Sequence, residues 1–455
     1  MSEQVKWSSN LIFLMASVGA AVGLANIWKF PYTAGEHGGG GFMIIYLLAI
    51  IFISFPIIVA ELFLGRRGKA GPVTSIINVA KEAKCSKLWG LAAYAGTLAA
   101  VLVMSFYFVI TGWIIFYALQ LLLGNLTGLS PDSIGQFFGE LTQNESRTVL
   151  YQSIAAFITW IVVAAGLKNG IERFVRYLMP VLLILLIAIS LYAAIYGDLQ
   201  TALKFLFQLK IEDISAKTVL YASGQALFTV GAGSCVMIVY GSFLPQSVSI
   251  MKSSFQIVAA DTIVALLAGI AIFPLVFAFN MQPAEGPGLL FVTLPIVFSQ
   301  SSAGSIIGAA FFLMVAIAAI TSAIAIVQPP IIWLERRFGM QRLGASLLAI
   351  FVMWILGFGT VCSFASCSGF YPLGMIPFFA EKTIFNTLEI IAINICLPVG
   401  SLLLAIFVGW RLPLSLCDNE LQEKNTLLMK FWYFSMRYII PPAILVVMLF
   451  GLTSH

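Results

Sequence analysis

Polar residues interrupt an apolar run near the start of the chain. Residues 23–42 read GLANIWKFPYTAGEHGGGGF and close a run that begins near Leu11 and is long enough to cross a bilayer. Asn26, Lys29 and Pro31 therefore fall in or beside a predicted membrane helix. Polar and ionisable groups are costly in hydrocarbon and usually serve a function there. The stretch predicts a binding site.

A later apolar segment has the same feature. It contains TVGAGS (229–234), as the first segment contains AAVGLAN (20–26). Glycine disfavours helix by up to about 1 kcal/mol relative to alanine, so both clusters mark places where a helix can unwind. Small residues also allow membrane helices to pack closely, but Asn26, Thr229 and Ser234 favour a site. Paired broken helices can frame a midplane site for ions and charged substrates.

The composition places these segments in a membrane protein. Of 455 residues, 60% are hydrophobic and 9% charged, and the mean hydropathy is +1.01. A soluble domain has about 25% charged residues. The first apolar run is too long for a removable signal peptide. We therefore predict an all-α polytopic protein in a lipid bilayer. Because the basic residues lie in loops, the net charge of +5 predicts no nucleic-acid partner.

Hydropathy and loop punctuation predict eleven spans. Interruptions in the first and sixth spans divide a single transmembrane domain, 1–455, into two five-helix repeats, about 8–197 and 217–411, and an extra helix, about 429–451. The predicted spans are 8–32, 39–65, 87–123, 149–167, 173–197, 217–243, 250–279, 303–334, 341–361, 383–411 and 429–451.

Lysine and arginine predict the orientation. If the spans alternate, the basic clusters fall on the side of the N-terminus, which predicts a cytoplasmic N-terminus and an external C-terminus in the plasma (inner) membrane. The clusters are Arg66, Arg67 and Lys69; Lys168, Arg173 and Arg176; Arg336, Arg337 and Arg342; and Arg411, Lys424 and Lys430.

Cysteine and histidine usage argues against an enzyme. The six cysteines have no metal-like CxxC spacing; Cys362 and Cys367 share one predicted external loop, where we favour free thiols over a disulfide. With only His37 and His455, and no HExxH or GxSxG, the sequence predicts neither a histidine metal site nor an intramembrane hydrolase. We expect no organic cofactor.

Several motifs resemble one family of transporters. GLANIWKFPY, HGGGGF and AELFLGRRG (60–68) are similar to motifs of the neurotransmitter:sodium symporter family, in its bacterial amino-acid transporter branch. SGQALFT (223–229), GPGLLFVTLP (286–295) and ITSAIAIVQP (320–329) resemble later motifs in family order. The resemblance implies the leucine-transporter fold of inverted five-helix repeats, alternating access and sodium-driven uptake of an amino acid.

The resemblance also implies two Na+ sites. The first would use the Ala21 carbonyl, Asn26, Thr229 and Asp261, where the family often has asparagine. The second would use the carbonyls of Gly19, Val22 and Ala318 with the hydroxyls of Thr321 and Ser322. Hydroxyls in membrane helices also bond back to their own helix, which is the alternative for the last two residues.

Asp261 also leads to a prediction about whether transport depends on chloride. Tyr46 and Gln225 match the anion site of chloride-dependent members, but Ala265 replaces a serine. We predict chloride-independent transport, in which Asp261 supplies the negative charge and is protonated on the return step. The alternative is an aspartate that only pairs locally.

The substrate pocket follows from the same resemblance. Gly23 stands where monoamine transporters have an aspartate, which implies a substrate with its own carboxylate. That carboxylate would meet the N–H groups of Leu24 and Ala25 and the Tyr107 hydroxyl, although Ala25 replaces a glycine. The substrate amine would meet carbonyls of Ala21, Phe228 and Thr229. The pocket side chains that differ from those of the family predict that the substrate is a hydrophobic, bulky or aromatic amino acid. The expected pocket comprises Ala20, Ala21, Leu24, Ala25, Val103, Tyr107, Phe228, Thr229, Gly231, Ser234, Ser322 and Ile326.

The gates follow the family only in part. Lys29 and Glu389 would form the outer gate, with lysine in place of the usual arginine, and Glu61 resembles an acid that binds the unwound segments. The cytoplasmic gate does not fit the family, although Trp7 matches. Lys6 with Glu335, one residue off in each case, could substitute for the ion pair; the alternative is a less stable inward-closed state. The departures there are Gln4, Phe243 and Arg336.

Other functions on this fold stay open. One alternative is a sodium-dependent carrier of a non-proteinogenic amino acid or small carboxylate, and another is an uncoupled sensor. We expect a monomer or a weak homodimer.

Overall fold

The chain folds into helices throughout the residues that the computed structural model describes, which are 6–210, 212, 214–281, 288–300, 304–422 and 426–453. The all-α prediction is confirmed. Gln4, Lys424, His455 and the start of the GPGLLFVTLP motif lie outside the described residues.

The first repeat holds the first five apolar segments. The helices are α1 (Asn10–Ala21) with the π-helical turn η1 (Ala25–Lys29) and α2 (Phe30–Glu36); α3 (Gly40–Ala49), η2 (Ile50–Ser54) and α4 (Phe55–Gly68); α6 (Leu91–Leu122); α8 (Glu145–Ala164); and η4 (Leu167–Glu172) with α9 (Arg173–Tyr196).

The remaining segments follow in the same order. They are α11 (Ala216–Thr229) with α12 (Val236–Ser242); α13 (Ile250–Ala278); α15 (Gly304–Ile326) with α16 (Gln328–Phe338); α17 (Arg342–Ser363); α18 (Ile384–Glu389), η8 (Ile390–Cys396), α19 (Leu397–Ile406) and η9 (Phe407–Arg411); and α21 (Leu427–Phe434), η10 (Ser435–Ile439) and α22 (Ile440–Thr453). Peripheral helices are α5 (Pro72–Glu82), α7 (Pro131–Gln143), α10 (Leu199–Phe207), α14 (Leu294–Ser299) and α20 (Leu414–Leu421).

Each predicted span corresponds to one of these segments. Within the described residues, nine helices are long and apolar enough to cross a membrane, and the bent pair Asn10–Ala21 and Ala25–Glu36 makes a tenth. The sixth predicted span consists of the two short helices α11 and α12. Both segments with mid-span glycine clusters are therefore broken, as the sequence predicts.

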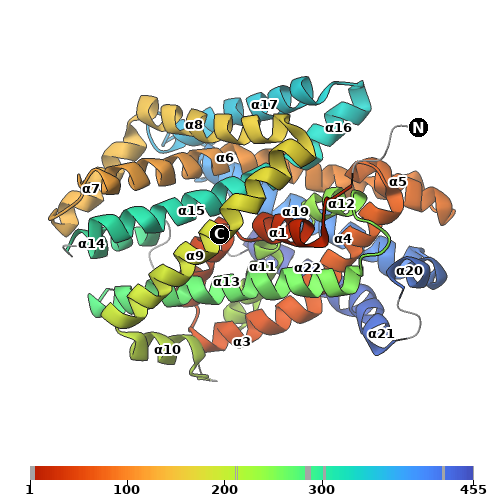
Figure 1. The fold of residues 1–455 in the computed structure, drawn as a ribbon, viewed down its shortest axis with the longest axis horizontal. Coiled ribbons are helices and arrows are strands. Elements are labelled where there is room, and N and C mark those ends of the chain that lie inside the picture. Colours follow the sequence, from red (N-terminus) through yellow and green to blue (C-terminus); the bar gives the residue numbers. More distant parts are fainter. Residues whose placement is uncertain are drawn as a thin grey trace.

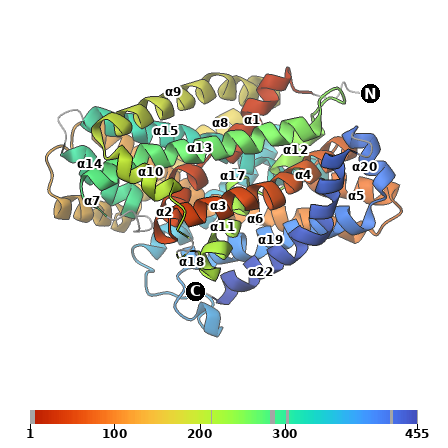
Figure 2. The ribbon, with the colours of Figure 1, turned by 90° about the horizontal axis from the view of Figure 1, so that it is seen from below.

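The helices pack around the two broken segments (Figure 1). The α6 helix runs beside α8, α15 and α17, and α1 packs against α13 and α15. Helix α12 packs on α4. In both views α5 and α20 lie at one end of the molecule and α7, α10 and α14 at the other (Figures 1 and 2). The basic cluster Arg66, Arg67 and Lys69, which precedes α5, therefore lies at the end opposite α7, α10 and α14.

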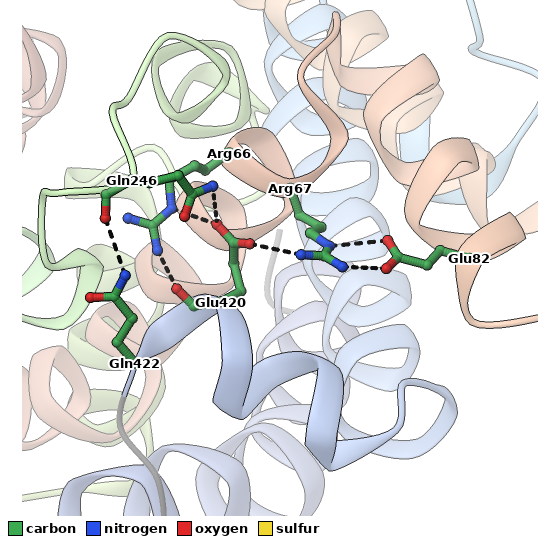
Figure 3. A network of polar contacts seen from close by, with 6 residues as sticks. All are labelled: Arg66, Arg67, Glu82, Gln246, Glu420 and Gln422. Atoms are coloured by element: carbon green, nitrogen blue, oxygen red, sulfur yellow. Dashed lines mark hydrogen bonds and ion pairs between the residues drawn. The ribbon is translucent and has the colours of Figure 1, made fainter.

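A buried ion pair joins the end of α4 to α20 (Figure 3). Arg66 Nε donates to Glu420 Oε1 at 2.6 Å, and both side chains are only 2% exposed. Arg66 Nη1 also donates to the Val248 carbonyl at 2.5 Å. Arg67 contacts Glu420 Oε2 at 3.3 Å and also pairs with Glu82 on α5. The Arg67 guanidinium lowers the pKa of the Glu82 carboxyl. The Glu420 carboxylate thereby fixes α20, which belongs to the linker between the last two spans.

The loop after α17 corrects one prediction. Cys362 and Cys367 form a disulfide rather than free thiols. The Cys367 N–H donates to the Cys362 carbonyl at 2.7 Å, so a tight turn brings the two side chains together. Ser366 also donates to Glu145 at the start of α8, from its N–H at 3.1 Å and from its hydroxyl. The turn is therefore held at both sides.

Candidate functional site

The first span breaks between Ala21 and Ala25. Val22 leaves the helix with φ −71° and ψ 103°, and the Gly23 N–H donates to Asn26 Oδ1 at 3.2 Å. A Cβ on Gly23 would lie 2.5 Å from Ser322 Oγ and 3.1 Å from Tyr107 Oη. Only glycine fits where α6 and α15 approach this break.

The sixth span breaks after Thr229. Gly231 and Gly233 have φ of +63° and +80°, a region in which glycine is favoured over other residues. A Cβ on Gly233 would lie 2.3 Å from Ser401 Oγ and 2.6 Å from the Leu397 carbonyl. The unwound segment therefore packs directly against α19. Sequence reasoning missed this contact because no motif links the sixth and tenth spans.

Asn26, Thr229 and Asp261 meet between the two breaks. Asn26 Nδ2 donates to Asp261 Oδ1 at 2.8 Å, and Thr229 Oγ1 donates to Asp261 Oδ2 at 3.1 Å. The three side chains are 0%, 2% and 0% exposed. Ala21, the fourth predicted ligand, ends α1 and is buried; carbonyls at a helix end lack intrahelical partners. Amide, hydroxyl and carboxylate oxygens suit a hard cation.

The residues of the second predicted sodium site also converge. Ser322 Oγ donates to the carbonyls of Gly19 at 3.2 Å and Val22 at 3.0 Å, which ties α15 to the end of α1. Thr321 Oγ1 donates to the Ala318 carbonyl at 2.9 Å and to Ile317 at 3.0 Å. A Cβ on Gly19 would lie 3.5 Å from the Thr321 Cβ. Thr321 bonds to its own helix here, whereas Ser322 bonds across to α1.

The predicted pocket residues come from α1, α6, α11 and α15 and from the two breaks. Val103 and Tyr107 of α6 are buried, and a Cβ on Gly23 would lie 3.1 Å from the Tyr107 hydroxyl. Phe228 is half-buried at the end of α11, and Ile326 is half-buried at the end of α15. Leu24 and Ala25 are buried, and Ala20 is half-buried in α1.

Ser234 differs from its predicted part in the pocket. Its hydroxyl donates to the Gly231 carbonyl at 2.5 Å, inside the unwound turn. The hydroxyl therefore stabilises the turn instead of standing free for a substrate. A Cβ on Gly231 would lie 3.3 Å from that hydroxyl oxygen, so the two residues pack closely within the turn.

The residues at the positions of the family's anion site, and Glu61, are buried. Gln225 Nε2 donates to the Ala25 carbonyl at 2.9 Å, and Tyr46 and Ala265 are fully buried. Glu61 Oε1 accepts the Gly233 N–H at 2.8 Å. This bond matches the predicted contact of Glu61 with the unwound sixth span.

At the predicted outer gate, Lys29 lies over an aromatic ring. Its Nζ is 4.3 Å from the centroid of Phe228, a cation–π geometry. Among the described residues, Lys29 and Glu389 are not within ion-pair distance in this conformation. The Lys29–Glu389 pair stays a prediction for a more closed state.

The opposite end is closed by Trp7. Its Nε1 donates to the Tyr240 carbonyl at 3.0 Å, and its ring packs 5.2 Å from that of Tyr240 and 6.5 Å from that of Phe243. Ser8, which sequence reasoning missed, donates to Glu172 from its N–H at 3.0 Å and its hydroxyl at 2.5 Å. The segment before α1 is therefore fixed to both α12 and η4.

The predicted Lys6–Glu335 pair is wrong. Glu335 Oε1 lies 3.4 Å from Arg342 Nη1, and Lys6 is exposed. Arg342 also donates to the Val163 carbonyl at 3.0 Å and to Gln328 Oε1 at 2.5 Å. Arg342 begins α17, close to α16, so it reaches Glu335 more readily than the N-terminal segment does.

Two broken helices that bring buried oxygen groups together are typical of membrane transporters with inverted helical repeats. A model of the sodium:neurotransmitter symporter family matches residues 4–131 and 142–455. The chain belongs to that family. The resemblance seen in the sequence motifs is thereby confirmed.

Known proteins are similar over nearly the whole chain. An uncharacterized sodium-dependent transporter of Bacillus subtilis, YhdH, is 36% identical over 99% of this chain and 98% of its own. An uncharacterized sodium-dependent transporter of Haemophilus influenzae is 30% identical over 98% of each. The crystal structure of MhsT in complex with L-phenylalanine aligns with a TM-score of 0.90 at 35% identity, covering 98% of this chain and 99% of MhsT.

Proposed function

We propose that this protein is a sodium-coupled symporter that imports a hydrophobic or aromatic amino acid by alternating access, without a requirement for chloride. One observation carries the proposal. Asp261 is fully buried with Asn26 and Thr229, and no basic side chain of the described residues lies within ion-pair distance of it. A buried carboxylate without a counter-charge is strongly unfavourable, so a bound cation would stabilise it.

The substrate assignment rests on the first break and on a relative. The buried Tyr107 hydroxyl and the backbone of Leu24 and Ala25 would bind a carboxylate, and carbonyls of Ala21, Phe228 and Thr229 would bind an amine. Gly23 lets Ser322 and Tyr107 approach the break closely, since a Cβ there would lie 2.5 Å from Ser322 Oγ and 3.1 Å from the Tyr107 hydroxyl. L-Phenylalanine is bound in the crystal structure of MhsT, which supports an aromatic substrate here.

Coupling follows from the position of the two proposed ion sites. Asn26 closes the break of the first span and also contacts Asp261, and Ser322 bonds to the last turn of α1. Ions bound at both places would hold α1 against α13 and α15, which favours the conformation that binds substrate. When the first ion leaves, a proton on Asp261 would remove its unpaired charge.

Uptake into liposomes that contain the purified protein tests the proposal. With an inward sodium gradient we expect accumulation of labelled L-phenylalanine, and with choline we expect none. Replacing chloride by gluconate should leave the rate unchanged. Competition by the other amino acids gives the side-chain preference.

The outcomes separate the alternatives. Sodium-dependent binding without accumulation of any of the twenty amino acids would favour a different carboxylate substrate or an uncoupled sensor. No effect of sodium on binding or uptake would refute the assignment of Asn26, Thr229, Asp261, Thr321 and Ser322.

A further inference from the structure

Arg437 lies between the last two spans, in a corner formed by the aromatic rings of Trp410 and Tyr438. The Arg437 guanidinium carbon lies 4.4 Å from the Trp410 ring centroid and 5.4 Å from that of Tyr438. The two rings are 5.8 Å apart and inclined by 70°, so they form two walls around the cation. Trp410 Nε1 donates to the Arg437 carbonyl at 3.1 Å, which fixes one wall to η10.

The charge of Arg437 has no ion-pair partner among the described residues. Its Nε is buried without a hydrogen bond, and no carboxylate of the described residues lies within ion-pair distance. Cation–π contacts contribute only about 0.5–2 kcal/mol and leave the net charge in place. An ionised group within a membrane segment is costly unless it is paired. An anion from outside the chain would therefore stabilise this arginine.

The corner faces the lipid. Trp410 and Tyr438 are 52% and 51% exposed, and Phe434, which packs 5.3 Å from Tyr438, is 54% exposed. All three belong to membrane spans, where exposed side chains meet lipid. Trp410 is the second-to-last residue of the tenth span, Ile384–Arg411. Tryptophan and tyrosine at such a position sit at the level of the lipid headgroups.

Two further cations extend the patch. Arg411 follows Trp410 and is exposed. Lys430 is exposed and lies seven residues before Arg437, so it shares one helix face with Phe434 and Tyr438. Basic residues clustered between membrane helices at the headgroup level attract anionic lipids, and a guanidinium can hold a phosphate through two parallel hydrogen bonds.

We infer that Trp410, Arg437 and Tyr438 form a binding site for the phosphate of an anionic phospholipid, at the junction of the tenth and eleventh spans. Arg437 would bind the phosphate, and the rings would hold the guanidinium and contact the glycerol backbone. Arg411 and Lys430 would add attraction for the headgroup. The site is separate from the proposed transport site.

Native mass spectrometry of the full-length protein tests the inference. The detergent-purified protein is titrated with phosphatidylglycerol or with phosphatidylcholine of the same acyl chains, and the dissociation constant of the first bound lipid is measured. Arg437→Gln should weaken binding of phosphatidylglycerol about fivefold, the effect of one interfacial cation, and should leave phosphatidylcholine unchanged. Arg437→Lys keeps the charge but loses the two-point contact, so its effect should be intermediate.

Arg176→Gln is the matched control, because Arg176 is an exposed arginine on α9, away from this corner. Equal phosphatidylglycerol affinity in Arg437→Gln and in the wild type would overturn the inference, as would equal losses in Arg437→Gln and Arg176→Gln. If millimolar inorganic phosphate displaces the lipid from the wild type, a soluble anion is the ligand and the lipid assignment is wrong. If Arg437→Gln does not fold, Arg437→Lys decides between the same outcomes.

Discussion

Asp261 is the residue on which the proposed ion chemistry depends most directly. Its two oxygens accept bonds from Asn26 and Thr229, which belong to the two broken spans. Asp261→Asn keeps the shape and removes the charge. We expect sodium affinity to fall and uptake to become stimulated by chloride, because an anion could then supply the missing negative charge.

Uptake rates in chloride and gluconate at several sodium concentrations measure this effect. Asp132→Asn, at an exposed position on α7, is the control and should behave as the wild type. If Asp261→Asn shows unchanged sodium affinity and no response to chloride, then Asp261 only pairs locally.

Ser322 tests the second ion site. Ser322→Ala removes a hydroxyl that contacts the Gly19 and Val22 carbonyls. The loss of one such contact, about 1 kcal/mol, should raise the sodium concentration for half-maximal uptake roughly fivefold. Ser346→Ala removes a hydroxyl that bonds only within α17, to Leu343, and should leave this concentration unchanged. Equal behaviour of the two variants would remove Ser322 from the ion site.

Gly23 tests the substrate position. In Gly23→Ala the new methyl would lie 2.5 Å from Ser322 Oγ and would fill the space assigned to the carboxylate. We expect sodium-dependent L-phenylalanine binding to weaken about fivefold or more, since overpacking costs about 1–3 kcal/mol. Gly344→Ala, whose methyl meets only Met340 Cε at 3.7 Å, is the control in the same equilibrium binding assay. Normal binding by Gly23→Ala would place the carboxylate elsewhere.

At the scale of elements, the Arg66–Glu420 pair holds α20 against α4. Breaking a buried ion pair leaves an unpaired charge and costs about 3–5 kcal/mol. Glu420→Gln should therefore lower the thermal unfolding midpoint clearly. Glu82→Gln breaks an ion pair whose side chains are 34% and 44% exposed, and exposed pairs contribute about 0–1 kcal/mol.

Circular dichroism melts of the two variants in one detergent compare these costs. A midpoint for Glu420→Gln that is no lower than that for Glu82→Gln would show that the pair does not stabilise the linker.

At the scale of the whole molecule, transport requires the two ends to open in turn. The structure is closed at the Trp7 end, where the ring is 5% exposed. Truncating a buried aromatic ring costs about 3–5 kcal/mol. Trp7→Ala should favour the state open at that end and reduce the fraction that binds substrate from the other side.

Equilibrium binding of L-phenylalanine in saturating sodium measures this shift, and we expect a loss of roughly tenfold or more. Trp160→Ala, at a half-buried position on α8, is the control. Unchanged affinity in Trp7→Ala would mean that Ser8 and Glu172 suffice to close this end.

The sequence by itself determined the local features of the protein. Long apolar runs predicted helices at each span, because a segment buried in lipid must satisfy its backbone internally. Clustered glycines predicted both breaks, since unwinding depends on local backbone preference. The motif resemblance gathered Asn26, Thr229, Asp261, Gly19, Val22 and Ser322 into two groups, and the structure brings each group together.

Only the tertiary structure decided which side chains pair. Glu335 binds Arg342 rather than Lys6, Ser234 bonds within its own turn, and Cys362 bridges to Cys367. Lys29 lies over Phe228, and Arg437 lies beside two rings with no counter-charge among the residues that the structure describes. Such pairings depend on distances between elements far apart in the chain, or on the exact path of a turn. Residue types and spacing constrain neither, because several partners of suitable charge are always available in the sequence.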